Sequence, residues 1–234
     1  MEKKVLCIGD SLCLPGHLNK YEDTWFFKLK KEFPDFDFIS FFKRQLTTEI
    51  LVTMGGGKKG VDGWPKGADC LEAYLPHTII LQLGIVDCAP RLLYEFERKL
   101  VSRVPNLIKT NYLSLIKVLR KRNLGNTLVS FDKFKININN YIERAYNIGV
   151  SKIIIIGIAY PDEKMVDKNP QILQNVDKYN DFYKKISSEN KMVEIILPLD
   201  AKKYDYRIYE DGYHPNKAGH ELVKNRLAEL LCHS

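Results

Sequence analysis

The sequence predicts an α/β protein whose parallel sheet is covered by helices on both faces. Five short apolar runs alternate along the chain with segments in which apolar residues recur at helical spacing. Strands joined by right-handed helical crossovers run parallel and are buried on both sides. The 234 residues suit one domain, 1–234, because no internal repeat or low-complexity linker divides them. We therefore expect a three-layer α/β/α architecture.

The first expected strand, residues 5–8, lies at the centre of the argument. This apolar run stops at Gly9, which is typical of a buried strand that ends in a sharp turn. The fourth strand contains four consecutive isoleucines, Ile153 to Ile156, and should be buried on both faces. The remaining strands are expected at residues 36–42, 78–83 and 192–197, with the fourth strand spanning 151–158.

Helices are expected between these strands. The first, residues 22–33, carries Trp25, Phe26 and Leu29 at helical spacing, and Pro34 should stop it. Gly149 should close a second clear helix. The further helices are expected at residues 47–54, 136–148, 176–187 and 215–231.

Residues 92–134 form a longer connection than a crossover needs, and we expect a basic insertion of two helices there. Its basic residues include Arg98, Lys99, Arg103, Lys117, Arg120, Lys121 and Arg122. Two interpretations stay open: the charges solvate helix faces, or the segment caps the functional site and meets an anionic glycan or lipid carrier. The net charge of +7 favours an acidic partner only weakly.

Composition excludes several classes of protein. No apolar run approaches the roughly 20 residues of a membrane span. The chain runs directly into its first strand, so we expect no signal peptide and a cytoplasmic location. The five cysteines form no CxxC pair, so we expect neither structural zinc nor a disulfide framework, and no cofactor. The basic residues are not interleaved with aromatic residues, and no helix resembles a nucleic-acid reading helix, so we expect no nucleic-acid partner.

Two short motifs carry the chemistry. Ser11 follows Gly9 and Asp10 at the carboxyl end of the first strand, where ligands of open α/β sheets bind and where free N–H groups favour negative charge. Near the other end of the chain, Asp211 and His214 are close enough to meet on one loop. A serine nucleophile needs such a base, held by a carboxylate. The alternatives are a helix cap at the first motif and a surface turn at the second.

Together, Gly9-Asp10-Ser11-Leu12 and Asp211-x-x-His214 resemble the motifs of the SGNH, or GDSL, hydrolase superfamily. The resemblance implies a flavodoxin-like strand order of 2-1-3-4-5. It also implies serine esterase or acyltransferase chemistry, with Ser11 as nucleophile, His214 as base and Asp211 as its partner.

The oxyanion-hole motifs depart from the family pattern. The third strand leads into Gly84-Ile85-Val86-Asp87, where the family has G-x-N-D, so Val86 replaces an asparagine donor. This version of the block is similar to SGNH-like proteins of bacterial surface-polysaccharide clusters. Gln45 stands where the family has a glycine after the second strand, and the nearest glycines are Gly55 to Gly57. We list Gln45, Gly56, Val86, Asp87 and Arg91 as oxyanion or substrate-binding candidates, with Arg91 as the replacement donor.

The function expected from these residues is hydrolysis of an O-acylated, most naturally acetylated, carbohydrate. Two alternatives stay open: an O-acyltransferase of surface-polysaccharide biosynthesis, and a non-catalytic glycan-binding protein on the same fold. Nucleotide binding is disfavoured, because the first strand lacks G-x-G-x-x-G and the glycine-rich loop is not a Walker motif. The natural substrate and the oligomeric state do not follow from the sequence.

Overall fold

The computed structural model describes residues 3–52, 67–91, 101, 103–120, 127–200, 203 and 207–232. Its centre is a five-stranded sheet in which every pair is parallel, and the strand order β2-β1-β3-β4-β5 confirms the order expected from the family resemblance. The strands are β1 (Lys3–Gly9), β2 (Phe36–Phe42), β3 (Thr78–Gln82), β4 (Lys152–Ile156) and β5 (Val193–Ile196).

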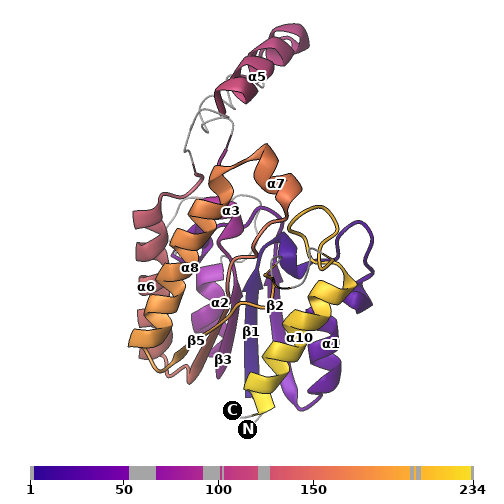
Figure 1. Cartoon of the computed structure of the whole chain (residues 1–234). Helices are drawn as coiled ribbons and strands as arrows, with labels where there is room; N and C mark the ends of the chain where they lie inside the picture. The colour runs from indigo at the N-terminus through magenta and orange to yellow at the C-terminus, as the bar shows by residue number, and fades with distance from the viewer. Residues whose placement is uncertain are drawn as a thin grey trace.

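Helices cover both faces of this sheet. Figure 1 shows α1 and α10 side by side on one face, with α6 and α8 on the opposite side. The described helices and 3₁₀ turns are η1 (Ser11–Cys13), η2 (Tyr21–Asp23), α1 (Trp25–Glu32), η3 (Thr48–Leu51), α2 (Gly67–Tyr74), α3 (Ile85–Cys88), α5 (Asn106–Arg120), α6 (Phe131–Asn147), α7 (Glu163–Lys168), α8 (Gln171–Glu189) and α10 (Lys217–Cys232).

The core explains why these segments fold as they do. The isoleucines of β4, Ile153 to Ile156, are fully buried, as are the apolar residues of β1. Thr24 caps α1 by accepting a hydrogen bond from the Phe27 amide, which satisfies a donor that the first turn leaves without an intrahelical partner. Burial on both faces is what the continuous apolar runs predict.

Several helices differ from expectation. No helix was predicted at α2, η3 is a short 3₁₀ turn within the helix expected at 47–54, and α8 begins at Gln171 rather than at residue 176. α6 begins five residues earlier than predicted, because Ser130 caps it and the buried Phe134 extends its apolar face by a turn. α7 occupies a segment that reads as a polar loop, where Asp162 accepts a hydrogen bond from the Met165 amide and caps a helix with little apolar pattern. Within residues 92–134, the described helices are α5 and the start of α6; residues 92–100, 102 and 121–126 lie outside the described part.

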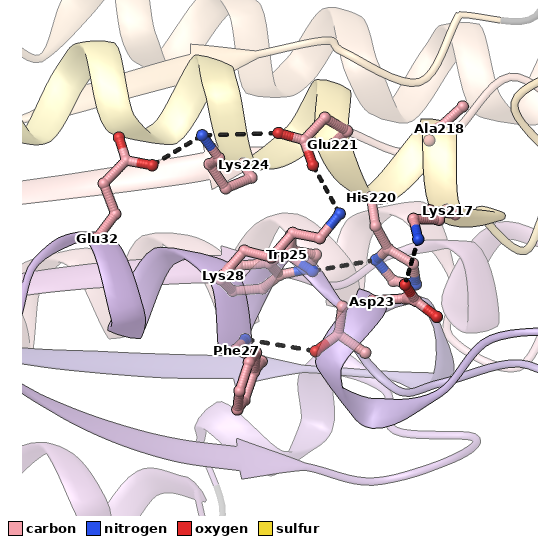
Figure 2. Close-up of polar contacts among 12 residues, drawn as sticks. Asp23, Trp25, Phe27, Lys28, Glu32, Lys217, Ala218, His220, Glu221 and Lys224 are labelled. Carbon is pink, nitrogen blue, oxygen red and sulfur yellow. Dashed lines mark hydrogen bonds and ion pairs between the residues drawn. The ribbon is translucent and has the colours of Figure 1, made fainter.

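Ion pairs with α1 hold the last helix, α10, in place. This helix begins just after the loop that carries His214. Figure 2 shows Lys28 paired with Glu221 at 2.6 Å and Lys224 paired with Glu32 at 2.7 Å between these two helices. Beneath them the Trp25 amide donates to Nδ1 of His220 at 3.4 Å. Among the described helices, none is long and apolar enough to cross a membrane.

Candidate active site

The parallel register brings the ends of β1 and β3 together. Gly9 is aligned with Gln82, and the Asp10 amide donates to the Gln82 carbonyl at 3.1 Å. Ser11 then opens η1, where Oδ1 of Asp10 accepts a hydrogen bond from the Leu12 amide at 2.9 Å. A Cβ at Gly9 would lie 2.1 Å from Sγ of Cys13, so a larger residue would have to displace the buried Cys13 side chain. The turn leaves the Ser11 side chain partly exposed at the sheet edge.

The loop before α10 brings a histidine and a carboxylate to Ser11. Nε2 of His214 lies 3.0 Å from Oγ of Ser11, and Nδ1 of His214 lies 2.8 Å from Oδ2 of Asp211. The His214 amide also donates to Oδ1 of Asp211 at 3.1 Å. Gly212 adopts a φ of +109°, a left-handed conformation that lets these two side chains turn toward each other. The three side chains thus form one hydrogen-bonded chain from hydroxyl to imidazole to carboxylate.

The charge state of Asp211 suits a partner for imidazolium. Partial burial raises the pKa of Asp211, but hydrogen bonds from the side chain and backbone of His214 oppose it and leave the pKa below its usual range. Asp211 therefore stays ionised in neutral solution. An ionised carboxylate holds the imidazole in the tautomer whose Nε2 can accept a proton from Ser11.

Tyr213 lies against the histidine and is a neighbour that motif reasoning missed. Its ring centroid is 4.3 Å from that of His214, with an interplanar angle of 33°. Burial and the negative charge of Asp211 raise the pKa of Tyr213, and the positive charge of Arg91 partly opposes this shift. Its place directly before the histidine was the only sequence signal for this contact.

A carboxylate joins the loop after Ser11 to the loop that carries His214. Glu210 accepts hydrogen bonds from the backbone amides of His17 at 2.9 Å and Leu18 at 3.2 Å. The Glu210 amide donates to the His214 carbonyl at 2.9 Å. A Cβ at Gly16 would lie 2.1 Å from Oε2 of Glu210, so a larger residue there would push this carboxylate aside. Nothing in the sequence separated Glu210 from other surface acids.

A buried polar network lies beneath the serine. Oε1 of Gln82 accepts hydrogen bonds from Sγ of Cys13 at 3.0 Å and from Nε1 of Trp25 at 2.9 Å. Asp10 is completely buried, and that burial raises its pKa to about 7, although the hydrogen bond from the Leu12 amide lowers it. Because Cys13 belongs to η1, this network holds in place the short helix that begins with Ser11.

Two of the oxyanion candidates, Gln45 and Arg91, lie in the segments that follow the ends of β2 and β3. Gln45 is exposed and has a φ of +62°, a conformation that favours glycine, which is the residue the family resemblance expects there. The loop that carries Gln45 is tied to β1, because the Lys43 amide donates to the Gly9 carbonyl at 3.1 Å. Nη2 of Arg91 donates to the Val86 carbonyl at 3.3 Å.

The remaining candidates differ in their surroundings. Val86 is buried in α3 and presents no hydrogen-bond donor from its side chain. Asp87 has no exposed surface, and Oδ1 accepts hydrogen bonds from the Thr48 hydroxyl at 2.6 Å and the Thr48 amide at 3.0 Å. These contacts point to positioning of η3 by Asp87 rather than to the substrate contact we expected. Gly56 lies outside the described residues.

Among the described residues no group of His, Cys, Asp and Glu side chains could hold a metal ion. The cysteines described are free thiols. The site that the structure assembles brings together a hydroxyl, an imidazole and a carboxylate, and these groups can perform nucleophilic acyl chemistry.

Comparisons with known proteins give a fold and no close relative. No family model and no curated protein matches the sequence. Three similar solved structures are a member of the lipolytic G-D-S-L family from Veillonella parvula, the esterase EstA from Pseudoalteromonas sp. in a form inhibited by monoethylphosphonate, and the acetylxylan esterase Axe2 from Geobacillus stearothermophilus.

The similarity to these three proteins covers nearly the whole of each chain. The Veillonella protein aligns with a TM-score of 0.54 at 14% identity over 97% of each chain. EstA aligns with a TM-score of 0.57 at 14% identity, over 97% of this chain and 95% of its own. Axe2 aligns with a TM-score of 0.55 at 13% identity, over 97% of this chain and 93% of its own. The chain therefore has the SGNH/GDSL hydrolase fold.

Proposed function

We propose that this protein is a serine ester hydrolase that removes an acyl group, of which acetyl is the best candidate, from a carbohydrate hydroxyl. One observation carries the proposal: Oγ of Ser11, Nε2 of His214 and the carboxylate of Asp211 form a continuous hydrogen-bonded chain with steps of 3.0 Å and 2.8 Å. These distances lie within the reach needed for proton transfer from nucleophile to base.

The reaction proceeds in two acyl transfers. Oγ of Ser11 attacks the ester carbonyl carbon while Nε2 of His214 takes its proton, and Asp211 stabilises the imidazolium that forms. The tetrahedral intermediate collapses, the C–O bond to the sugar breaks, and His214 returns the proton to the departing sugar oxygen. Water then attacks the acyl-serine by the same route, which releases the carboxylic acid and regenerates Ser11.

The oxyanion of each intermediate needs donors. We assign one to the amide of Ser11, and a second to the amide of Gln45, whose φ of +62° matches a glycine-like turn. Val86 supplies no side-chain donor, so the Arg91 guanidinium is our candidate for the third position. If Arg91 acts there, Arg91→Ala lowers kcat while Val86→Asn changes little. If the hole is only incomplete, Val86→Asn raises kcat and Arg91→Ala is neutral.

The carbohydrate part of the proposal rests on the family resemblance, and the fold shared with the acetylxylan esterase Axe2 is consistent with it. Water as acceptor gives a deacetylase, and a sugar hydroxyl gives an acyltransferase. A hydrolysis screen over acetylated mono- and oligosaccharides tests the proposal, with acetate release as the readout and Ser11→Ala as control. We expect release by the wild type alone; equal release by Ser11→Ala contradicts the nucleophile assignment.

A second candidate is a glycan-binding protein without catalysis. The observation that favours it is Val86, because loss of one oxyanion donor typically costs about 10² to 10³ in rate. Acetate release that depends on Ser11 excludes this candidate. Saturable binding of an acetylated glycan with no turnover supports it.

A further inference from the structure

A basic helix with exposed aliphatic residues projects from the end of the molecule at which the candidate active site lies. Figure 1 shows α5 projecting away from the sheet, beyond the end at which the strands finish, while the N-terminus lies at the opposite end. Ser11 follows the last residue of β1, so it belongs to the same end of the molecule as α5. α5 is therefore placed where it can contact a surface that the catalytic edge faces.

Three aliphatic residues of α5 are exposed, whereas Ile116 on the same helix is buried. Ile108, Leu115 and Val118 are 59%, 60% and 57% exposed, respectively. At 100° per residue, these positions fall on one side of the helix. Several large aliphatic side chains that share an exposed face mark a contact surface more often than chance.

The charges of α5 are all of one sign. Its sequence, Asn106–Arg120, contains Lys109, Lys117 and Arg120 and no acidic residue. Arg103 precedes the helix and is exposed. The periodicity places the three basic positions of α5 on the side of the helix away from Ile108, Leu115 and Val118. An amphipathic helix with a basic polar face suits the interface of an anionic bilayer, where the apolar side enters the acyl boundary.

We propose that α5 docks this protein on the surface of an anionic lipid bilayer, with the catalytic edge turned toward the membrane. Charge decides between this partner and a second copy of the chain. A second copy packed on the apolar side of α5 brings no acidic residue of its own α5 to the basic side, whereas anionic headgroups around the helix neutralise that side. A soluble anionic polymer satisfies the lysines but leaves the aliphatic side chains in water.

The test is flotation with lipid vesicles, which does not depend on catalysis. Vesicles of phosphatidylcholine with phosphatidylglycerol are compared with vesicles of phosphatidylcholine alone, at low and at high salt. We expect binding to the anionic vesicles and its loss at high salt, because ions screen charges beyond roughly 8–10 Å. Ser11→Ala should bind as the wild type does, so failure of this proposal and failure of the hydrolase proposal are distinguishable.

A matched pair of isoleucines provides the control. Ile108 is 59% exposed on α5, and Ile136 is 57% exposed on α6. Ile108→Asp should weaken vesicle binding at least tenfold, and Ile136→Asp should leave it unchanged. Equal effects of both variants, or no vesicle binding by the wild type, overturn the proposal. A dimer in solution that Ile108→Asp dissociates, without vesicle binding, assigns the face to a second copy instead.

Discussion

Glu210 should control how well Ser11 and His214 are aligned. Its carboxylate accepts hydrogen bonds from the amides of His17 at 2.9 Å and Leu18 at 3.2 Å, and its own amide donates to the His214 carbonyl at 2.9 Å. Replacement by glutamine keeps the size of the side chain but leaves one acceptor oxygen in place of two. One of the two loop amides then faces an NH₂ group and loses its partner.

The expected size of the effect follows from these contacts. A hydrogen bond to a charged group contributes about 1.5–3 kcal/mol, and the partial exposure of Glu210 favours the lower end. We expect Glu210→Gln to destabilise the fold by about 1–2 kcal/mol. Loosening the loop after Ser11 should also lengthen the 3.0 Å contact between Ser11 and His214, and misplacement of about 1 Å can cost 10²-fold in rate.

The assay is steady-state hydrolysis of a small acetyl ester, with urea unfolding measured on the same samples. We expect kcat to fall about 10- to 100-fold with a smaller change in KM. Glu22→Gln is the control, since Glu22 is an exposed glutamate of η2. An unchanged kcat in Glu210→Gln, with the stability loss present, refutes the alignment role. An equal loss in Glu22→Gln shows that the effect is one of general surface charge.

Three further outcomes follow from the structure. Arg91→Ala should lower kcat by about 10² with little change in KM, and Arg91→Lys should restore only part of it, which ester kinetics can check. Burial lowers the pKa of His220 from its usual 6.5 to about 4. The stability that the neutral His220 contributes is therefore present above about pH 6.5 and is lost as the pH falls toward 4. Wild type should lose up to about 3 kcal/mol more than His220→Gln over that range in urea unfolding, and parallel pH curves contradict this. Thr48→Val removes the hydroxyl that bonds Asp87 at 2.6 Å and should cost about 1–3 kcal/mol, whereas Thr47→Val, at a position without a side-chain cap bond, should cost less than 1 kcal/mol.

The sheet was predictable because its three central strands, β1, β3 and β4, contain continuous apolar runs. Residues 36–42 match β2 without change, and β4 lies within the expected segment around Ile153 to Ile156. α7 was not predictable from periodicity, because Glu163–Lys168 carries few apolar residues and depends on the Asp162 cap. The end of such a helix is set by local hydrogen bonds that a pattern of apolar residues does not contain.

The residues of the candidate site also fall into those that the sequence predicted and those that depend on contacts in the folded protein. Ser11, Asp211 and His214 could be selected from two motifs, because this chemistry needs specific residue types and the base lies only three residues from its carboxylate. Glu210 could not, since its contact with His17 joins segments that only the folded loops bring together, and no motif marked Tyr213, although it directly precedes His214. Asp87 follows β3 as a candidate for the site should, yet its hydrogen bonds with Thr48 turn it inward. Side-chain direction at a strand end depends on such tertiary partners.

The most direct test of the proposed function is covalent labelling with a fluorophosphonate, followed by mass spectrometry of the labelled peptide. The proposed mechanism predicts one adduct on Ser11, no adduct in Ser11→Ala, and labelling at least 10²-fold slower in His214→Ala, because the base no longer accepts the proton of the hydroxyl. Absence of labelling in a folded wild-type protein, or an adduct that persists in Ser11→Ala, contradicts the assignment of Ser11 as the nucleophile.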